Sequence, residues 1–168
     1  EPAKENILFG NEKIVATPHL GASTTEAQEN VALQVAEQIS DYLLTGAITN
    51  ALNMPSISAS EAQKVGPWIA LASKLGAFAG QLTDTSLTAV EIVYEGTASL
   101  LNTRALSQAA LAGLLSPILS GVNMVNAPSV AKERGIKVSE VRRGQEGAYE
   151  GYVKITVTLG NGSTRRVA

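Results

Sequence analysis

The sequence predicts an α+β protein: an antiparallel sheet of about four strands covered by helices, preceded by a short strand–loop–helix segment. Apolar residues recur every three or four positions over the long stretches 24–45 and 60–82, which indicates amphipathic helices. Apolar and polar residues alternate at 86–95 and again at 151–159, which indicates strands. Helices and strands do not alternate regularly, so we expect neither a parallel βαβ repeat nor a dinucleotide-binding unit.

Composition limits the function classes. The chain has 168 residues, 45% of them hydrophobic, which is enough for one domain or for one domain plus a further piece. It has no cysteine, which excludes disulfides and thiolate chemistry and agrees with a cytoplasmic location. No apolar run approaches the ~20 residues that a membrane-spanning helix needs, so we expect no membrane association of that kind.

Charge is distributed unevenly. Residues 1–131 hold 5 basic and 11 acidic residues, a net of −6, whereas residues 132–168 hold 8 basic and 4 acidic residues, a net of +4, and the two sum to −2. The basic part carries too few cations and aromatic residues to indicate a nucleic-acid surface. A small anion is a more suitable partner for it, and an ordinary solvated surface is the alternative.

His19 is the only histidine of the chain. The residues 13–17 indicate a short strand, because the residue before Pro18 is pushed toward extended backbone. Ser23 and Glu26 fit a capping box, which predicts that a helix begins at about residue 24. His19 therefore lies on a loop between two ordered elements, where a working side chain can be held and still be reached.

An imidazole can take up and release a proton near neutral pH, so His19 is a candidate acid/base residue. An ordinary surface histidine is the alternative. A zinc site is not expected, because the chain has no cysteine and no second histidine, and such sites use three or four of these ligands.

The helix predicted at 24–45 ends at Gly46, a typical C-terminal cap. Its apolar face needs a cover, which a second copy of the chain could supply; the face consists of Ala27, Val31, Val35, Ile39, Tyr42 and Leu43. Residues 46–59 are rich in asparagine, serine and proline and indicate a linker. We place the domain boundary at about 56, which gives domains of 1–55 and 56–168.

The second domain opens with a helix over 60–82, for which Ser60 is the expected cap and Gly66-Pro67 the point where the helix should kink or restart. The strand at 86–95 has one apolar face, formed by Thr88, Val90, Ile92 and Tyr94. Further helices are expected at 102–115 and 126–134, and further strands at 136–143, 151–159 and 164–168. Asn161-Gly162 is a strong hairpin signal. We expect the last three strands to pair as an antiparallel meander and the strand at 86–95 to complete the sheet.

The first third of the chain resembles a known family. Glu1-Pro2, Asn6-Ile7-Leu8-Phe9-Gly10, Ala16-Thr17-Pro18-His19-Leu20-Gly21-Ala22-Ser23-Thr24 and Glu26-Ala27-Gln28 resemble the end of the catalytic core of the D-isomer-specific 2-hydroxyacid dehydrogenases. A looser likeness continues through Leu101–Leu106 and Asn126-Ala127-Pro128. The resemblance implies that 1–55 is the C-terminal remnant of a Rossmann-type catalytic core. It also implies that 56–168 is the intervening domain of the longer members.

In that family the histidine of the T-P-H-x-G motif is the catalytic acid/base, and His19 matches it. Gly21, Ala22 and Ser23 match the segment beside the nicotinamide of NAD. The branch with an intervening domain oxidises 3-phosphoglycerate to 3-phosphohydroxypyruvate, the first step of serine biosynthesis. Another D-2-hydroxyacid dehydrogenase, such as a hydroxypyruvate reductase, is an alternative that the extra domain disfavours.

The chain lacks the glycine-rich G-x-G-x-x-G turn that holds dinucleotide phosphates. In the family the arginine that binds the substrate carboxylate and the acidic partner of the histidine both lie upstream. We therefore expect the chain to be a piece of a longer enzyme and to be inactive by itself.

For the intervening domain the resemblance implies an allosteric substrate or anion site and an oligomer contact, with a homodimer or homotetramer as the expected assembly. The candidate ligand is a phosphorylated hydroxy acid, and the candidate residues are Arg143, Lys154 and Arg166. Guanidinium groups bind phosphate through paired hydrogen bonds, and a lysine adds a point charge. Arg142 should point to the opposite face from Arg143. The alternative is that these are solvated charges that protect the edges of the sheet.

Overall fold

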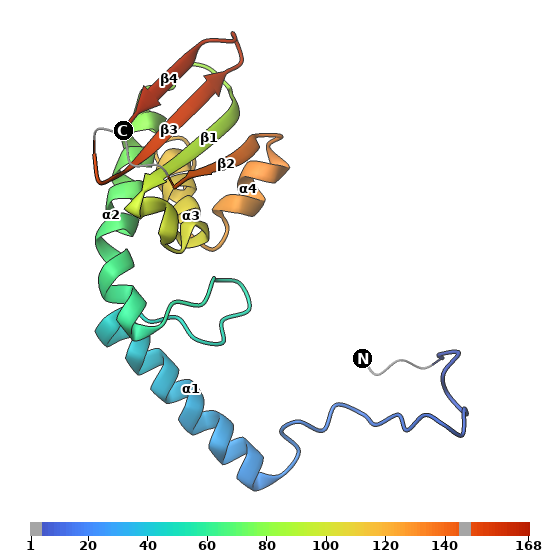
Figure 1. Ribbon diagram of the computed structural model, residues 1–168. Helices are drawn as coiled ribbons and strands as arrows, with labels where there is room; N and C mark the ends of the chain where they lie inside the picture. Colours follow the sequence, from blue (N-terminus) through green and yellow to red (C-terminus); the bar gives the residue numbers. More distant parts are fainter. Residues whose placement is uncertain (1–4, 145–148) are drawn as a thin grey trace. The chain divides into compact units, whose positions relative to one another are not determined.

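The computed structural model describes residues 5–144 and 149–168. In chain order the elements are α1 (Thr25–Thr45), α2 (Ala59–Gln81), β1 (Leu87–Gly96), the 3-10 turn η1 (Thr97–Leu100), α3 (Thr103–Leu115), α4 (Ala127–Glu133), β2 (Lys137–Arg143), β3 (Gly151–Leu159) and β4 (Thr164–Val167) (Figure 1). The chain forms two compact units, one up to Ser40 and one from Asp41 onward. The boundary expected at about 56 stays a prediction. Within the described residues, no helix has the length and apolarity to cross a membrane.

The segment before α1 contains turns and no strand among its described residues. The strand expected at 13–17 is therefore wrong for this chain, because a strand needs a hydrogen-bonding neighbour and the described segment contains none.

The helix expected next is confirmed, but its cap is Thr24, whose Oγ1 accepts a hydrogen bond from the Ala27 amide at 3.1 Å. Ser23 lies one residue too early, and Ala27 rather than a glutamate occupies the third helical position. Gly46 follows the helix with φ +76°, as expected for a C-terminal cap.

The predicted linker is partly ordered. Ile48 and Ile57 form an isolated antiparallel bridge with N–O distances of 2.7 and 2.8 Å. Directly after it, Ser58 begins α2 with a capping box: the Glu61 carboxylate accepts from the Ser58 amide at 2.9 Å, and Ser58 Oγ accepts from the Glu61 amide at 3.3 Å. The expected cap at Ser60 is thus wrong by two residues.

The helix α2 runs through Pro67 without a break, so the restart that was one of the two expected outcomes does not occur, and the kink stays a prediction. The residue before a proline is normally crowded by the ring through its Cβ. Gly66 has no Cβ, which removes this conflict and lets the helix continue. Beyond the proline, Trp68, Ile69 and Leu75 pack against the core cluster and stabilise the continuous helix.

The four strands form a mixed sheet in the order β2-β1-β3-β4. β1 pairs with β2 in parallel and with β3 in antiparallel orientation, and β3 pairs with β4 in antiparallel orientation. The expected meander of the last three strands is therefore wrong, because β2 adds to the far side of β1. The physical reason is the connection between β1 and β2: it passes through η1, α3 and α4, and such a long crossover is what parallel pairing requires. Of the expected meander, only the hairpin at Asn161-Gly162, between β3 and β4, forms; Gly162 has φ +81°.

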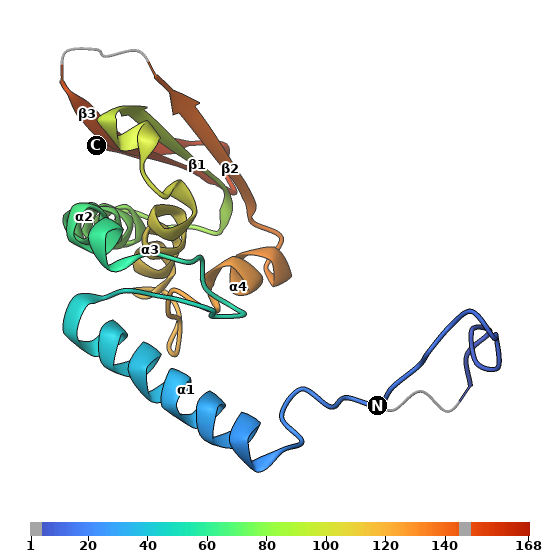
Figure 2. The same ribbon diagram turned by 60° about the horizontal axis from the view of Figure 1, so that its bottom comes forward.

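The helices α2, α3 and α4 lie together on one side of the sheet (Figure 2). The sheet residues that face them are buried, namely Val90, Ile92 and Tyr94 of β1 and Val153, Ile155 and Val157 of β3. The expected α+β layer and the expected apolar faces of these two strands are confirmed.

The helices α2 and α3 pack unusually closely. A Cβ added to Gly76 would meet the backbone carbonyl of Ala110, and one added to Gly113 would meet that of Ser73. The small side chains that dominate the composition are therefore what permits this two-layer core.

Candidate functional site

The loop that carries His19 is exposed along its whole length. Ser23 closes a turn by donating its amide hydrogen to the Leu20 carbonyl at 3.2 Å, and Gln28 Nε2 donates to the Ala22 carbonyl at 3.3 Å. These contacts fix the backbone between the histidine and α1. His19 is thus presented on an accessible, locally ordered loop, which suits a residue that exchanges a proton with a small molecule.

Within the described residues, the segment from Gly21 to Ser23 forms no enclosed site for a dinucleotide. A Cβ added to Gly21 would meet no atom within 4 Å, so this glycine makes no cradle with the rest of the described chain. Gly21, Ala22 and Ser23 are all exposed. Their contact with NAD therefore stays a prediction.

The second candidate site is the sheet face that points away from α2, α3 and α4, which we call the open face. It consists of Ala89, Glu91, Val93 and Glu95 of β1, Lys137, Ser139, Val141 and Arg143 of β2, Tyr152, Lys154, Thr156 and Thr158 of β3, and Thr164 and Arg166 of β4. Four of these residues are basic and two are acidic, a net of +2. The basic character of the C-terminal part of the chain is thus partly concentrated on one surface.

All three predicted anion-binding residues lie on the open face. Arg142 is opposite Tyr94 and Arg143 opposite Glu95, so the two arginines point to opposite faces of the sheet as expected. Arg165 likewise lies on the helix side, where its guanidinium is 3.8 Å from the Asp84 carboxylate, and Arg166 lies on the open face.

Lys154 and Arg166 are close neighbours. Arg166 is opposite Thr156, which is the next open-face residue after Lys154 on β3. Diagonal neighbours on adjacent antiparallel strands are about 7–8 Å apart, within reach of long side chains. Lys154 is half-buried and Arg166 is exposed, so the two cationic groups of the pair differ in their access to solvent.

Arg143 does not join this pair directly. β1 lies between β2 and β3, so Arg143 is two strand spacings, about 10 Å, from the β3 residues of its row. Its guanidinium is instead 3.9 Å from the Glu95 carboxylate. Tyr152, on the other side of Glu95, donates its hydroxyl hydrogen to the same carboxylate at 2.9 Å, and this hydrogen bond raises the pKa of the Tyr152 phenol.

Sequence reasoning missed Glu95 and Tyr152 as part of this surface. Both residues fit the alternation of apolar and polar side chains along their strands, so the sequence indicates on which face of the sheet each lies. Their contact with Arg143 was not readable, because it depends on the parallel pairing of β1 with β2. The arrangement offers a small anion two cationic groups close together and a third, next to a carboxylate, that is two strands from Lys154 and three strands from Arg166.

Comparisons with known proteins identify relatives of both parts of the chain. Residues 64–168 match the family described as D-3-phosphoglycerate dehydrogenase intervening domain. The D-3-phosphoglycerate dehydrogenase of Bacillus subtilis is 41% identical over 159 residues, and that of Methanocaldococcus jannaschii is 42% identical over 157 residues. These matches cover 94% and 93% of this chain and 30% of each relative.

A third relative is the chloroplastic D-3-phosphoglycerate dehydrogenase 3 of Arabidopsis thaliana, 38% identical over 98% of this chain and 29% of its own length. The chain therefore spans about 30% of the length of the curated relatives that it matches.

Proposed function

The chain belongs to the D-3-phosphoglycerate dehydrogenase intervening-domain family, and from this premise we propose that it is a section of an NAD-dependent D-3-phosphoglycerate dehydrogenase. The whole enzyme oxidises 3-phosphoglycerate to 3-phosphohydroxypyruvate, at the start of serine biosynthesis. Within it, His19 accepts the proton of the substrate hydroxyl during oxidation and returns it in the reverse direction. The α+β unit binds a phosphorylated hydroxy acid on its open face and acts as a regulatory element.

The dehydrogenase role is supported by the similarity to three dehydrogenases over more than nine tenths of the chain, which includes the loop of His19. The isolated chain should not turn over substrate, because it has no phosphate-binding turn for NAD. A protein extended to the full length of the relatives should be active, and His19→Gln should abolish turnover while 3-phosphoglycerate still binds. Turnover by the isolated chain, or an active His19→Gln enzyme, would contradict this role.

The regulatory role rests on one observation: Arg143, Lys154 and Arg166 share the open face of the sheet. The closely spaced Lys154 and Arg166 suit a phosphate group, which accepts several charge-assisted hydrogen bonds. Arg143 lies far enough away to receive the carboxylate at the other end of the same molecule. A phosphorylated hydroxy acid, with an anionic group at each end, therefore suits these separated cationic groups better than inorganic phosphate does.

Calorimetric titration of the chain with 3-phosphoglycerate tests this role. Arg143→Gln should weaken binding about tenfold, because one of two anionic ends loses a charge-assisted partner. Arg142→Gln removes the same charge from the next position but from the other face, and it should leave the affinity nearly unchanged. Equal losses in the two variants would indicate a general charge effect instead of a site.

Homo-oligomer formation is a further part of the proposal. No residue of α1 is buried, and its apolar side chains Val31, Val35, Ile39 and Tyr42 are each about half exposed or more. An apolar stripe of this kind needs a cover. In the whole enzyme we expect the cofactor domain and a second subunit to provide it, in a dimer or tetramer. We also propose a cytoplasmic location, on the basis of the amino-acid composition.

Another D-2-hydroxyacid dehydrogenase, such as a hydroxypyruvate reductase, is the second candidate for the whole enzyme. The similarity of residues 64–168 to an intervening domain named for D-3-phosphoglycerate dehydrogenase favours the first candidate. A comparison of kcat/KM for 3-phosphoglycerate and for glycerate with the full-length enzyme would decide between the two.

A further inference from the structure

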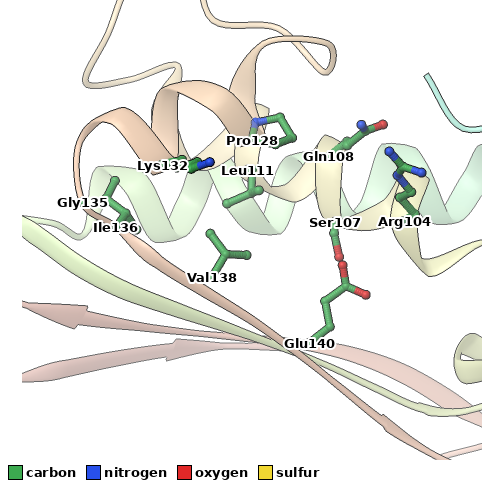
Figure 3. A pocket seen from close by; sticks show the side chains of 10 residues that line it. All are labelled: Arg104, Ser107, Gln108, Leu111, Pro128, Lys132, Gly135, Ile136, Val138 and Glu140. Carbon is green, nitrogen blue, oxygen red and sulfur yellow. The ribbon is translucent and has the colours of Figure 1, made fainter. Parts of the chain in front are cut away.

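A pocket of about 540 Å³ lies between α3, α4 and β2, on the helix side of the sheet (Figure 3). It is a different surface from the open face, because the β2 residues that line it are Val138 and Glu140, whereas Lys137, Ser139 and Arg143 point the other way. All the residues that line it belong to the second compact unit. None of them was a candidate on the basis of sequence.

The polar groups of the pocket divide between its two ends. Figure 3 shows Arg104, Ser107, Gln108 and Glu140 toward one end and Lys132 toward the other. Three of the first group come from one face of α3, because residues three and four positions apart on a helix are neighbours. Leu111 and Val138 line the part between the two ends and make it apolar.

Gln108 supplies an independent sign that the pocket receives a ligand. The residue is only 6% exposed, and its Oε1 is buried without a hydrogen-bond partner in the described chain. Buried polar atoms are nearly always paired, so each exception calls for a partner from outside the chain. Its neighbour Ser107 is also buried and shares a hydrogen bond of 2.7 Å with the Tyr94 hydroxyl. The polar end of the pocket is thus held firmly by the core.

We propose that this pocket binds an α-amino acid whose side chain ends in a second carboxylate. The first carboxylate pairs with Arg104, and the ammonium group is held by Glu140 and by the amide oxygen of Gln108. The methylene groups lie along Leu111 and Val138, and the second carboxylate reaches Lys132. The charges balance, because two cations and one anion of the protein meet two carboxylates and one ammonium group of the ligand.

The test is a titration of the complete chain, labelled with ¹⁵N, with L-glutamate as the probe. Two reference compounds accompany it: glutarate, which lacks the ammonium group, and L-norvaline, which lacks the second carboxylate. We expect L-glutamate to shift the side-chain amide of Gln108 and the backbone amides around Ser107 and Lys132. Both reference compounds should bind about tenfold more weakly or worse, because each leaves one charged group of the pocket unpaired.

Three substitutions complete the test. Lys132→Met should weaken L-glutamate binding about tenfold, whereas Lys137→Met, on the open face, should leave it unchanged. Gln108→Met should reduce the preference for L-glutamate over glutarate, of which Glu140 keeps a part, and should keep or raise the melting temperature, because it removes an unpaired buried oxygen. The proposal is overturned if millimolar L-glutamate shifts no pocket resonance, if glutarate binds equally well, or if Lys137→Met weakens binding as much as Lys132→Met.

Discussion

The guanidinium of Arg143, at the end of β2, lies 3.9 Å from the carboxylate of Glu95 on β1. The pair exists because β1 and β2 run in parallel and bring the two residues into register. The pair is partly exposed, so it contributes little to stability, on the order of 0–1 kcal/mol. We propose that its importance is for binding: Glu95 neutralises Arg143, one of the four cationic groups of the open face, and competes with any anion for it.

Substitution of Glu95 tests this competition. Glu95→Gln should tighten the binding of 3-phosphoglycerate several-fold, because Arg143 no longer has an anionic neighbour. Glu91→Gln makes the same change of charge on the open face, beside Ser139 and Thr156 instead of Arg143. Calorimetric titration of both variants checks the expectation. If Glu91→Gln has the same effect, the gain comes from the net charge of the face and not from Arg143.

The capping box of α2 predicts a dependence of stability on pH. The Ser58 hydroxyl and amide donate to the Glu61 carboxylate and lower the pKa of that carboxyl group. The stabilisation is therefore complete above the pKa of an unfolded glutamate, about 4.3, and is lost as the pH falls through the lower, folded value. Glu61→Gln should flatten this part of the acid profile in melting experiments.

The same capping box gives a test at neutral pH. Ser58→Ala should cost about 1 kcal/mol of unfolding free energy, the usual value for loss of an N-terminal cap. Ser60→Ala is the control, since Ser60 bonds only to the Ser58 hydroxyl, at 3.2 Å. Urea unfolding of both variants distinguishes them, and a larger loss for Ser60→Ala would mean that the helix begins at Ser60 after all.

The close packing of α2 against α3 predicts that Gly113 tolerates no side chain. Gly113→Ala should destabilise the domain by about 1–3 kcal/mol, because the new Cβ would meet the backbone of Ser73 and neither helix can yield cheaply. This loss would occur although alanine is the better helix former by about 1 kcal/mol. Ala112→Gly, one position earlier, should cost about that helix-propensity difference plus the contact of one partly buried methyl group with the core. A stabilising Gly113→Ala would show that the helices are further apart than described.

A buried hydroxyl pair predicts coupling between two elements. Tyr94 is fully buried on β1, and burial raises the pKa of its phenol; its hydroxyl lies 2.7 Å from Ser107 Oγ on α3. Tyr94→Phe should cost about 1–3 kcal/mol, because it leaves the Ser107 hydroxyl without this partner. Adding Ser107→Ala should cost less than the two single changes summed. Strictly additive costs in urea unfolding would mean that the two hydroxyls do not interact.

Most elements of this fold could be predicted because they depend on local patterns. The alternation along β1 and β3 identified the buried side chains that face the helices but not Val93, which is buried on the other face, and Asn161-Gly162 identified the hairpin. The two caps were missed by one or two residues, because runs such as Ser23-Thr24-Thr25 and Ser58-Ala59-Ser60 offer several equivalent hydroxyl groups.

The order of the strands could not be predicted in the same way. The pairing of β2 depends on where α3 and α4 return the chain, and local alternation carries no information on that. The alternation within β2 indicated that Arg142 and Arg143 face opposite sides of the sheet. It could not indicate that Glu95 and Tyr152 lie beside Arg143, because that depends on which strands pair. The pocket between α3, α4 and β2 was missed because the residues that line it, Arg104 and Lys132 among them, come from separate elements.

The most direct test of the regulatory role is the melting temperature of the chain with and without millimolar 3-phosphoglycerate, with phosphate and sulfate as controls. A ligand that binds only the folded state must raise the midpoint by mass action. We predict a rise that is specific to 3-phosphoglycerate, lost in Lys154→Met and Arg166→Gln, and kept in Arg165→Gln, whose side chain lies on the other face. No rise, or an equal rise with sulfate, would contradict the account and leave the open face as a solvated surface.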